Sequence, residues 1–138
     1  MKVLVACEYS GTVREAFRKK GHDAISCDII PTVIPGPHYE GDIFDILYDD
    51  WDIMIAHPPC TYLSNAGARH LYPKGVLNEE RYKKGLEAKE FFMKLWEIPH
   101  IDKVCVENPI SSKVFEMPLH SQEIQPYEYG HPLSKRTR

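Results

Sequence analysis

The chain has 138 residues, 43% of them hydrophobic, and a formal net charge of −3. This length allows one hydrophobic core and is short for two, so we expect a single globular domain over residues 1–138. The negative net charge gives no general support for a nucleic-acid partner, because such partners are usually met by a basic face. Charge varies locally, however: the segments RYKKGLEAKEFFMK and SKRTR are basic.

Two features of the sequence indicate its compartment. It contains no run of about 18 apolar residues, and the apolar stretch within MKVLVACEYSG is too short for a signal sequence. The four cysteines, Cys7, Cys27, Cys60 and Cys105, are widely spaced and form no CxxC pair, which favours neither a disulfide framework nor a zinc site. We therefore expect a cytoplasmic protein with free thiols and no membrane partner.

The first part of the chain predicts a strand, a tight turn and a helix. Lys2–Cys7 is an apolar run with β-branched residues, and the segment TVREAFRKKGH, which begins at Thr12, has apolar residues at helical spacing. Thr12 and Glu15 fit the two ends of a capping box, and Gly21 stands where the helix should end.

The rest of the chain continues this alternation. We expect strands over Asp23–Asp28, Asp52–His57 and Lys103–Pro109, and a long helix over Asn78–Ile98. The proline-rich segment 29–42 is expected to be a loop. Continuous apolar character in the last two strands indicates burial on both faces, as in a parallel sheet. The pattern predicts an α/β fold with a mostly parallel sheet and helices on both faces.

Ligands bind at the carboxyl ends of the strands in such a sheet, and the candidate functional residues stand there. A glycine in the first turn, Gly11, lets a ligand approach the backbone, although one glycine is also typical of a turn that only connects strand and helix. Asp28, about twenty residues further on, can accept hydrogen bonds from a ribose. Asp42 can reach an adenine amino group if it follows an edge strand, whereas the ordinary interpretation is an aspartate in an exposed loop. These residues indicate an adenosine-containing cofactor.

The segment HPPC places a thiol directly after a buried strand and two prolines. The prolines stiffen the loop and fix the position of Cys60, where backbone N–H groups would stabilise the thiolate, which is the nucleophilic form. The alternative is that Cys60 is a small buried hydrophobic residue, the role that we expect for Cys7, Cys27 and Cys105. A metal site of His57 and Cys60 lacks two further ligands at suitable spacing, so no metal is expected.

Glu107 lies in the segment VENP, at the end of the last predicted strand. A carboxylate at the end of an apolar strand is costly to bury unless it is paired or functional, because desolvation favours its neutral form. A glutamate held partly protonated would donate a hydrogen bond to a ring nitrogen.

Taken in order, these segments resemble the cytosine-C5 DNA methyltransferases, in particular short phage-type members that lack the target-recognition region. HPPCTYLSNAG is similar to the family's Pro-Cys nucleophile motif, with Ser64 and Gly67 at its usual serine and glycine. Glu107-Asn108-Pro109 resembles its Glu-Asn-Val motif, and EYGHPLSKRTR resembles its Tyr-Gly-x-Pro-Gln-x-Arg-x-Arg motif. Enzymes that methylate exocyclic amino groups have an aromatic residue at the position of Cys60.

The resemblance implies a Rossmann-like methyltransferase fold, S-adenosyl-L-methionine as cofactor and DNA as partner. The cofactor-binding residues that it implies are Glu8, Tyr9, Ser10, Gly11, Asp28, Ile29, Asp42, Ile43 and Pro58. The catalytic residues that it implies are Cys60, Glu107, Asn108, Arg136 and Arg138.

The resemblance also implies the reaction, which is methyl transfer to carbon 5 of a cytosine flipped out of the DNA. Cys60 would add to ring carbon 6, and Glu107 would contact N3 and so stabilise the charge that develops on the ring. Asn108 would hold the loop, and Arg136 or Arg138 would orient the base.

The chain departs from the family pattern near its C-terminus. Leu133 stands in place of the glutamine of the Tyr-Gly-x-Pro-Gln-x-Arg-x-Arg motif. The two arginine positions of the motif fall on Lys135 and Thr137 or on Arg136 and Arg138, depending on how the motif is aligned. The chain stops at Arg138, so we expect a C-terminally truncated fold with an exposed sheet edge, which a second copy or a completing partner chain would cover. Two alternatives follow: a catalytically incomplete, methyltransferase-like binding or regulatory domain, and a cytosine methyltransferase acting on RNA or a free nucleotide.

Overall fold

The computed structural model describes the whole chain, Met1 to Arg138. The chain forms two compact units: unit 1 comprises Met1–Pro58 and Lys94–Val106, and unit 2 comprises Pro59–Met93 and Glu107–Arg138. The single domain expected from the chain length stays a prediction. None of the helices combines the length and the apolar character needed to cross a lipid bilayer.

Unit 1 contains a five-stranded sheet in which every strand pairing is parallel. Its strands are β1 (Lys2–Ala6), β2 (Asp23–Asp28), β3 (His38–Glu40), β4 (Ile53–Ala56) and β5 (Lys103–Val106), in the order β3-β2-β1-β4-β5. The predicted parallel α/β architecture is confirmed, and it is compatible with a Rossmann-like fold. The strand order reverses between β1 and β4, the point at which sheets of this kind bind ligands.

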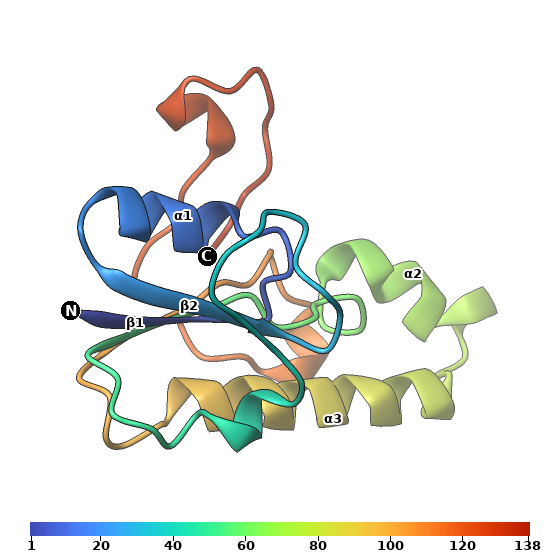
Figure 1. Cartoon of the computed structure of the whole chain (residues 1–138). Helices are drawn as coiled ribbons and strands as arrows, with labels where there is room; N and C mark the ends of the chain where they lie inside the picture. Colours follow the sequence, from blue (N-terminus) through green and yellow to red (C-terminus); the bar gives the residue numbers. More distant parts are fainter. The chain divides into compact units, whose positions relative to one another are not determined.

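The core of unit 1 is centred on β1, which is fully buried from Val3 to Ala6. Val3 and Val5 pack against Val13 and Phe17 of helix α1 (Thr12–Lys19). Figure 1 shows α1 lying along β1 and β2. Because both sides of a central parallel strand are covered, its sequence is a continuous apolar run, which is why the prediction of β1 was accurate.

Two strands differ from the predictions. The proline-rich segment contains a short edge strand, β3, and only residues 29–37 form a loop, called the proline-rich loop below. The strand predicted over Lys103–Pro109 is shorter and is not buried on both faces, because Lys103 and Cys105 are exposed and Val106 is buried. Alternate residues of a strand point to opposite faces, so one face of β5 is exposed and the predicted burial of Cys105 was wrong.

The helices match their predicted ranges closely. α1 ends at Lys19, and Gly21 follows with φ +84°, in the left-handed conformation typical of a helix end. The predicted long helix is α3 (Glu79–Trp96), which is followed by Pro99 and belongs to unit 2 as far as Met93. The expectation of helices on both faces of the sheet stays a prediction, since α1 is the helix that lies wholly within unit 1.

Unit 2 consists of short turns around one apolar cluster. The buried residues of the cluster are Leu63, Leu71 and Phe115, and Tyr82 of α3 packs against them. A Cβ atom at Gly85 would collide with the Phe115 ring, so the glycine allows the ring to lie directly on α3. The other elements are the one-turn helix α2 (Ala68–Leu71) and short 3-10 turns over Asn65–Gly67, Pro73–Gly75, Lys113–Phe115 and Pro126–Tyr129. Leu86, which the α3 pattern counted as apolar, is 43% exposed.

Candidate functional site

A pocket of about 250 Å³ opens at the carboxyl end of β1 in unit 1. It is lined by Cys7, Glu8, Tyr9, Ser10, Val13 and His57, which come from the turn between β1 and α1, from α1 itself and from the residue after β4. Ala6 aligns with Ala56 of β4, so the two strands end at the same level, where the strand order reverses. The volume lies just below the range of about 300–1,000 Å³ typical of small-molecule sites, and it suits part of a nucleoside cofactor.

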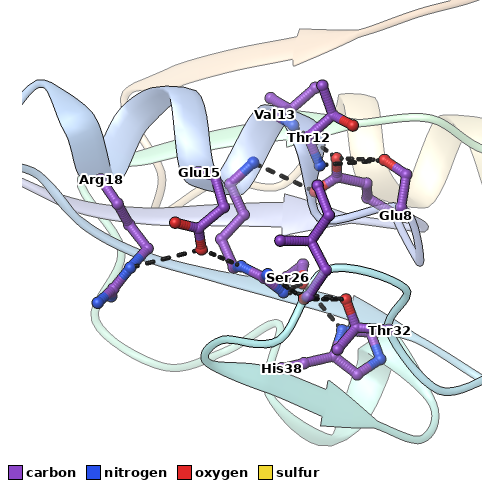
Figure 2. A network of polar contacts seen from close by, with 11 residues as sticks. Glu8, Thr12, Val13, Glu15, Arg18, Ser26, Thr32 and His38 are labelled. Atoms are coloured by element: carbon purple, nitrogen blue, oxygen red, sulfur yellow. Dashed lines mark hydrogen bonds and ion pairs between the residues drawn. The ribbon is translucent and has the colours of Figure 1, made fainter.

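Glu8 is nearly buried, at 5% exposure, and its carboxylate caps α1. The carboxylate accepts hydrogen bonds from the backbone N–H groups of Val13 (2.7 Å) and Arg14 (3.2 Å) and from the hydroxyl of Ser10 (2.9 Å), as Figure 2 shows in part. These N–H groups belong to the first turn of the helix, where no helical carbonyl is available, and a negative charge is favoured at that end. Glu8 therefore fixes the pocket turn to the helix.

The predicted capping box of Thr12 and Glu15 was wrong. Gly11 is the N-cap residue, and the N–H of Thr12 donates instead to the hydroxyl of Ser10 at 3.1 Å. The carboxylate of Glu15 pairs with Arg14 at 2.9 Å and Arg18 at 3.6 Å. The buried carboxylate of Glu8 takes the place of the local cap because the turn folds it back over the helix end.

Gly11 has φ +81°, a conformation that favours glycine. A Cβ atom there would lie 2.6 Å from Nη2 of Arg14 and 3.0 Å from Cβ of Ile34. The close approach at this glycine is therefore made by two side chains of the protein itself. Its predicted role toward a cofactor stays a prediction.

Arg14 is fully buried, and no motif in the sequence pointed to it. Its guanidinium donates hydrogen bonds to Glu15 Oε1 (2.9 Å), Ser26 Oγ (2.9 Å), Thr32 Oγ1 (3.1 Å) and the carbonyl oxygen of Ile34 (2.5 Å), in the network of Figure 2. A buried cation is tolerated when its donors are satisfied in this way. Arg14 thereby joins α1, β2 and the proline-rich loop.

The proline-rich loop is held to the pocket turn by further contacts. The N–H of Val33 donates to the carbonyl of Tyr9 at 2.8 Å. The ring of His38 bridges the hydroxyl of Ser26 (2.8 Å) and the carbonyl of Ile30 (3.0 Å). The loop is thus an ordered wall next to the pocket turn.

The two predicted cofactor acids follow neighbouring strands. Asp28 ends β2, and its Oδ1 accepts a long hydrogen bond of 3.3 Å from the N–H of Ile30. Asp42 follows edge strand β3 and caps the 3-10 turn Ile43–Asp45, accepting from the N–H of Phe44 at 3.0 Å. The edge strand on which its predicted contact with adenine depended is therefore present. The contacts of both acids with a cofactor stay predictions.

Two thiols lie close to these acids. Burial raises the pKa of Cys7 to about 12, with a further contribution from the negative charge of Asp28, and burial and Asp28 likewise raise the pKa of Cys27 to about 11. Both residues are neutral thiols near pH 7. Cys27 is buried as predicted, whereas Cys7 is half-buried and lines the pocket. The negative charge of Asp42 makes a smaller contribution to both raised pKa values.

All nine predicted cofactor residues belong to unit 1, but their exposure differs. Glu8, Tyr9 and Ser10 line the pocket. Ile29 is 77% exposed in the proline-rich loop, whereas Ile43 and Pro58 are buried and offer little surface to a ligand.

The five predicted catalytic residues all belong to unit 2. Cys60 is half-buried, and its carbonyl accepts hydrogen bonds from the N–H groups of Leu63 (3.0 Å) and Ser64 (2.9 Å). We refer to residues 60–64 as the Cys60 turn. These N–H groups point at the carbonyl oxygen of Cys60, and the expected stabilisation of its thiolate by backbone donors stays a prediction.

Backbone pairing ties the Cys60 turn to the chain that follows Glu107. Ser64 pairs with Ser111 in an antiparallel bridge. Hydrogen bonds on either side of it run from the N–H of Asn65 to the carbonyl of Ile110 (2.8 Å) and from the N–H of Ser112 to the carbonyl of Leu63 (2.8 Å). The structure therefore holds the segment that starts at Cys60 against the segment that starts at Glu107, which is half-buried.

Asn108 connects the same segment to the C-terminal arginines. It exchanges two backbone hydrogen bonds of 2.7 Å with Arg138, and its side-chain amide donates to the hydroxyl of Ser111 at 2.6 Å. Asn108 is only 7% exposed, so these contacts restrain the loop. The catalytic role that the resemblance implies for Asn108 stays a prediction.

Arg136 and Arg138 share one carboxylate. Nε of Arg138 lies 3.0 Å from Oε2 of Glu123, and Nε of Arg136 lies 3.6 Å from Oε1. Thr137, between them, instead forms a backbone pair with Ile124. Of the two candidate registers, the arginine pair is therefore the one whose side chains converge, and Glu123, which no motif indicated, orients them.

The structure gathers no set of three or more His, Cys, Asp or Glu side chains that could hold a metal ion. Among the pocket residues, sequence reasoning missed Cys7, Val13 and His57. The position of His57 directly after a predicted strand was the available signal. It places the residue near the end of β1 only once the two strands are known to be neighbours. Comparison of the chain with protein-family models, with curated proteins and with solved structures found no match.

Proposed function

We propose that the chain is a methyltransferase that uses S-adenosyl-L-methionine to methylate carbon 5 of cytosine in DNA. The observation that carries this proposal is the backbone pairing in unit 2 that holds the Cys60 turn against the segment after Glu107 and Asn108. It provides a thiol and a carboxyl group on two short loops tied to each other, which is the pair that addition to a cytosine ring needs.

Unit 1 supports the cofactor part of the proposal. A Rossmann-like methyltransferase site lies at the point where the strand order reverses, and the pocket is found there. Asp28 uses Oδ1 for its bond to Ile30, and Oδ2 would accept from a ribose hydroxyl. Glu8 would support the cofactor site indirectly by holding the pocket turn in place, because its carboxylate already caps α1. The cofactor, when bound, supplies the methyl group.

In the proposed mechanism the residues of unit 2 activate the base. The Cys60 sulfur forms a bond to ring carbon 6 after its thiol proton is lost, and Glu107 hydrogen-bonds or protonates N3, which offsets the negative charge that addition places on the ring. Carbon 5 becomes nucleophilic and forms a bond to the methyl group, while the electron pair of the broken sulfur–methyl bond would stay on the sulfur of the donor, leaving a thioether. Removal of the carbon-5 proton by a base then expels the Cys60 thiolate and restores the aromatic ring.

The proposal is tested with radiolabelled S-adenosyl-L-methionine and mixed-sequence DNA. Wild type and Cys105→Ser, which alters an exposed thiol in β5, should transfer label to DNA, whereas Cys60→Ser should transfer none while still binding the cofactor in calorimetry. Full transfer by Cys60→Ser would exclude the mechanism. Cofactor binding without transfer by wild type would favour the binding or regulatory domain.

Competing RNA and cytidine nucleotide, added to the same assay, rank the alternative substrates. Preferential methylation of DNA, with all three substrates at equal concentration, would support DNA as the substrate. Preferential methylation of RNA or of the nucleotide would favour that alternative.

A further inference from the structure

Unit 2 carries a cluster of one aromatic ring and two cations directly after Cys60. The guanidinium carbon of Arg81 lies 5.0 Å from the centre of the Tyr62 ring, and Nζ of Lys84 lies 5.8 Å from it. Arg81 and Lys84 are three residues apart in α3, so they share a face of the helix. We refer to these three residues as the Tyr62 cluster.

Arg81 attaches the cluster to the Cys60 turn. Its Nη2 donates a hydrogen bond of 3.0 Å to the carbonyl of Thr61, and a Cβ atom at Gly67 would lie 2.7 Å from the same nitrogen. Thr61 and Tyr62 are inside the Cys60 turn. The positive charge of Arg81 is therefore held against the loop that presents the thiol.

The charges of the cluster are only partly balanced. The Thr61 carbonyl oxygen and the Tyr62 ring, which both contact the Arg81 guanidinium, carry no net negative charge. Lys84 pairs with Glu80 at 3.1 Å, with side chains 46% and 79% exposed, and this hydrogen bond raises the pKa of Lys84. Such an exposed pair contributes little to stability, so the ammonium group can exchange Glu80 for another anion.

The wider charge distribution also favours an anion at unit 2. Unit 2 has ten Lys and Arg against eight Asp and Glu, whereas unit 1 has seven against twelve. A polyanion is therefore attracted to unit 2 and repelled by unit 1.

We propose that the Tyr62 cluster is a contact site for the phosphate backbone of the DNA strand that carries the target cytosine. The inference rests on the proposed function, because a cytosine that reacts with Cys60 brings its own strand next to the Cys60 turn. Arginine and lysine bind phosphates by charge, and arginine adds directed hydrogen bonds. The Tyr62 ring holds both cations in place before the strand arrives.

The test compares Lys84→Gln with Lys83→Gln. Lys83 is the control because it is an exposed lysine next to Lys84 in the same helix but lies on a different side of that helix. Fluorescence anisotropy measures the binding of labelled single- and double-stranded DNA at several salt concentrations. Lys84→Gln should weaken binding several-fold and reduce the slope of log K against log salt by about 0.7 to 0.9, the value for one lost phosphate contact. Lys83→Gln should leave the slope unchanged, and thermal unfolding should show both variants folded.

Three results would overturn the contact site. They are equal slopes for the two variants and wild type, equal reductions in both variants, or displacement of DNA by inorganic phosphate beyond the effect of chloride at equal ionic strength, which indicates a simple anion site.

Methyl transfer, measured on the same samples, separates the two proposals. No transfer by wild type together with a reduced slope in Lys84→Gln removes the proposed enzyme and supports the nucleic-acid contact. Transfer by wild type together with unchanged slopes removes the contact site alone.

Discussion

The two units of the chain are built by different means. Unit 1 is a regular sheet whose buried polar groups are joined through Arg14 and Glu8, and it carries an excess of acidic residues. Unit 2 has short turns held by pairs of backbone hydrogen bonds around the apolar cluster of Leu63, Leu71 and Phe115. It carries a small excess of basic residues. The difference shows that a regular sheet and a set of irregular turns can be held together by different kinds of hydrogen bond within one short chain.

The largest effect is expected for a substitution in the apolar cluster of unit 2. Phe115→Ala removes a buried ring that lies on Gly85 of α3, and we expect a loss of about 4 kcal/mol in the free energy of unfolding. Hydrogen exchange should show lost protection in the Glu79–Met93 part of α3, with β1 amides protected as in wild type. Equal loss of protection in β1 would contradict the separate stabilisation of the two units.

The next largest effect is expected for a substitution of the buried arginine in unit 1. Arg14→Ala removes the guanidinium donor to Ser26 and leaves the carbonyl of Ile34 with only the Thr32 hydroxyl as donor, and we expect a loss of about 3 kcal/mol in urea unfolding. Arg18→Ala is the matched control, because Arg18 is 38% exposed and pairs with the same Glu15, and it should lose less than about 1 kcal/mol. Similar losses in the two variants would show that the buried network adds nothing to the stability of unit 1.

The smallest effect concerns the buried thiols of unit 1, whose pKa values are raised by burial and by nearby carboxylates. The folded protein keeps Cys7 protonated up to about pH 12, whereas the unfolded chain releases the proton near the ordinary pKa of 9.0. The unfolded state therefore binds fewer protons above pH 9, and the free energy of unfolding should fall as pH rises from about 9. Cys7 contributes about 1 kcal/mol of this fall over the first pH unit, and Cys27, whose pKa is raised to about 11, contributes a similar amount. Urea titrations at pH 8, 9 and 10 measure this.

Cys7→Ala should show a shallower fall, while Cys105→Ser, at an exposed position, should follow the wild type. A wild-type slope in Cys7→Ala would assign the pH dependence to other groups.

The fold was predictable where the information is local. β1, β2, β4, α1 and α3 follow apolar patterns that depend only on neighbouring residues, and the structure has them within a few positions of the predicted ranges. β3 was missed because a short strand between prolines carries too little pattern. The exposed face of β5 was missed because the sequence VCV is apolar whether one face or two are covered.

The candidate site was predictable only in part, for the same reason. Glu8 and Cys60 could be selected because each directly follows a strand or a pair of prolines. Arg14 and Glu123 could not, because their partners lie in other segments and only the folded chain brings them together. A cap formed by Glu8 was likewise hidden behind a local Thr12–Glu15 pattern that fits the sequence equally well.

The raised pKa of Cys7 has a consequence for chemical self-protection. A sulfonium methyl donor is an electrophile, and a thiolate beside it would be alkylated by it. Cys7 lines the pocket that we assign to the cofactor, and with a pKa of about 12 only about one molecule in 10⁵ carries the thiolate at pH 7. Burial of the thiol, with a further contribution from the carboxylates of Asp28 and Asp42, disfavours that thiolate and would keep the pocket from consuming its own methyl donor.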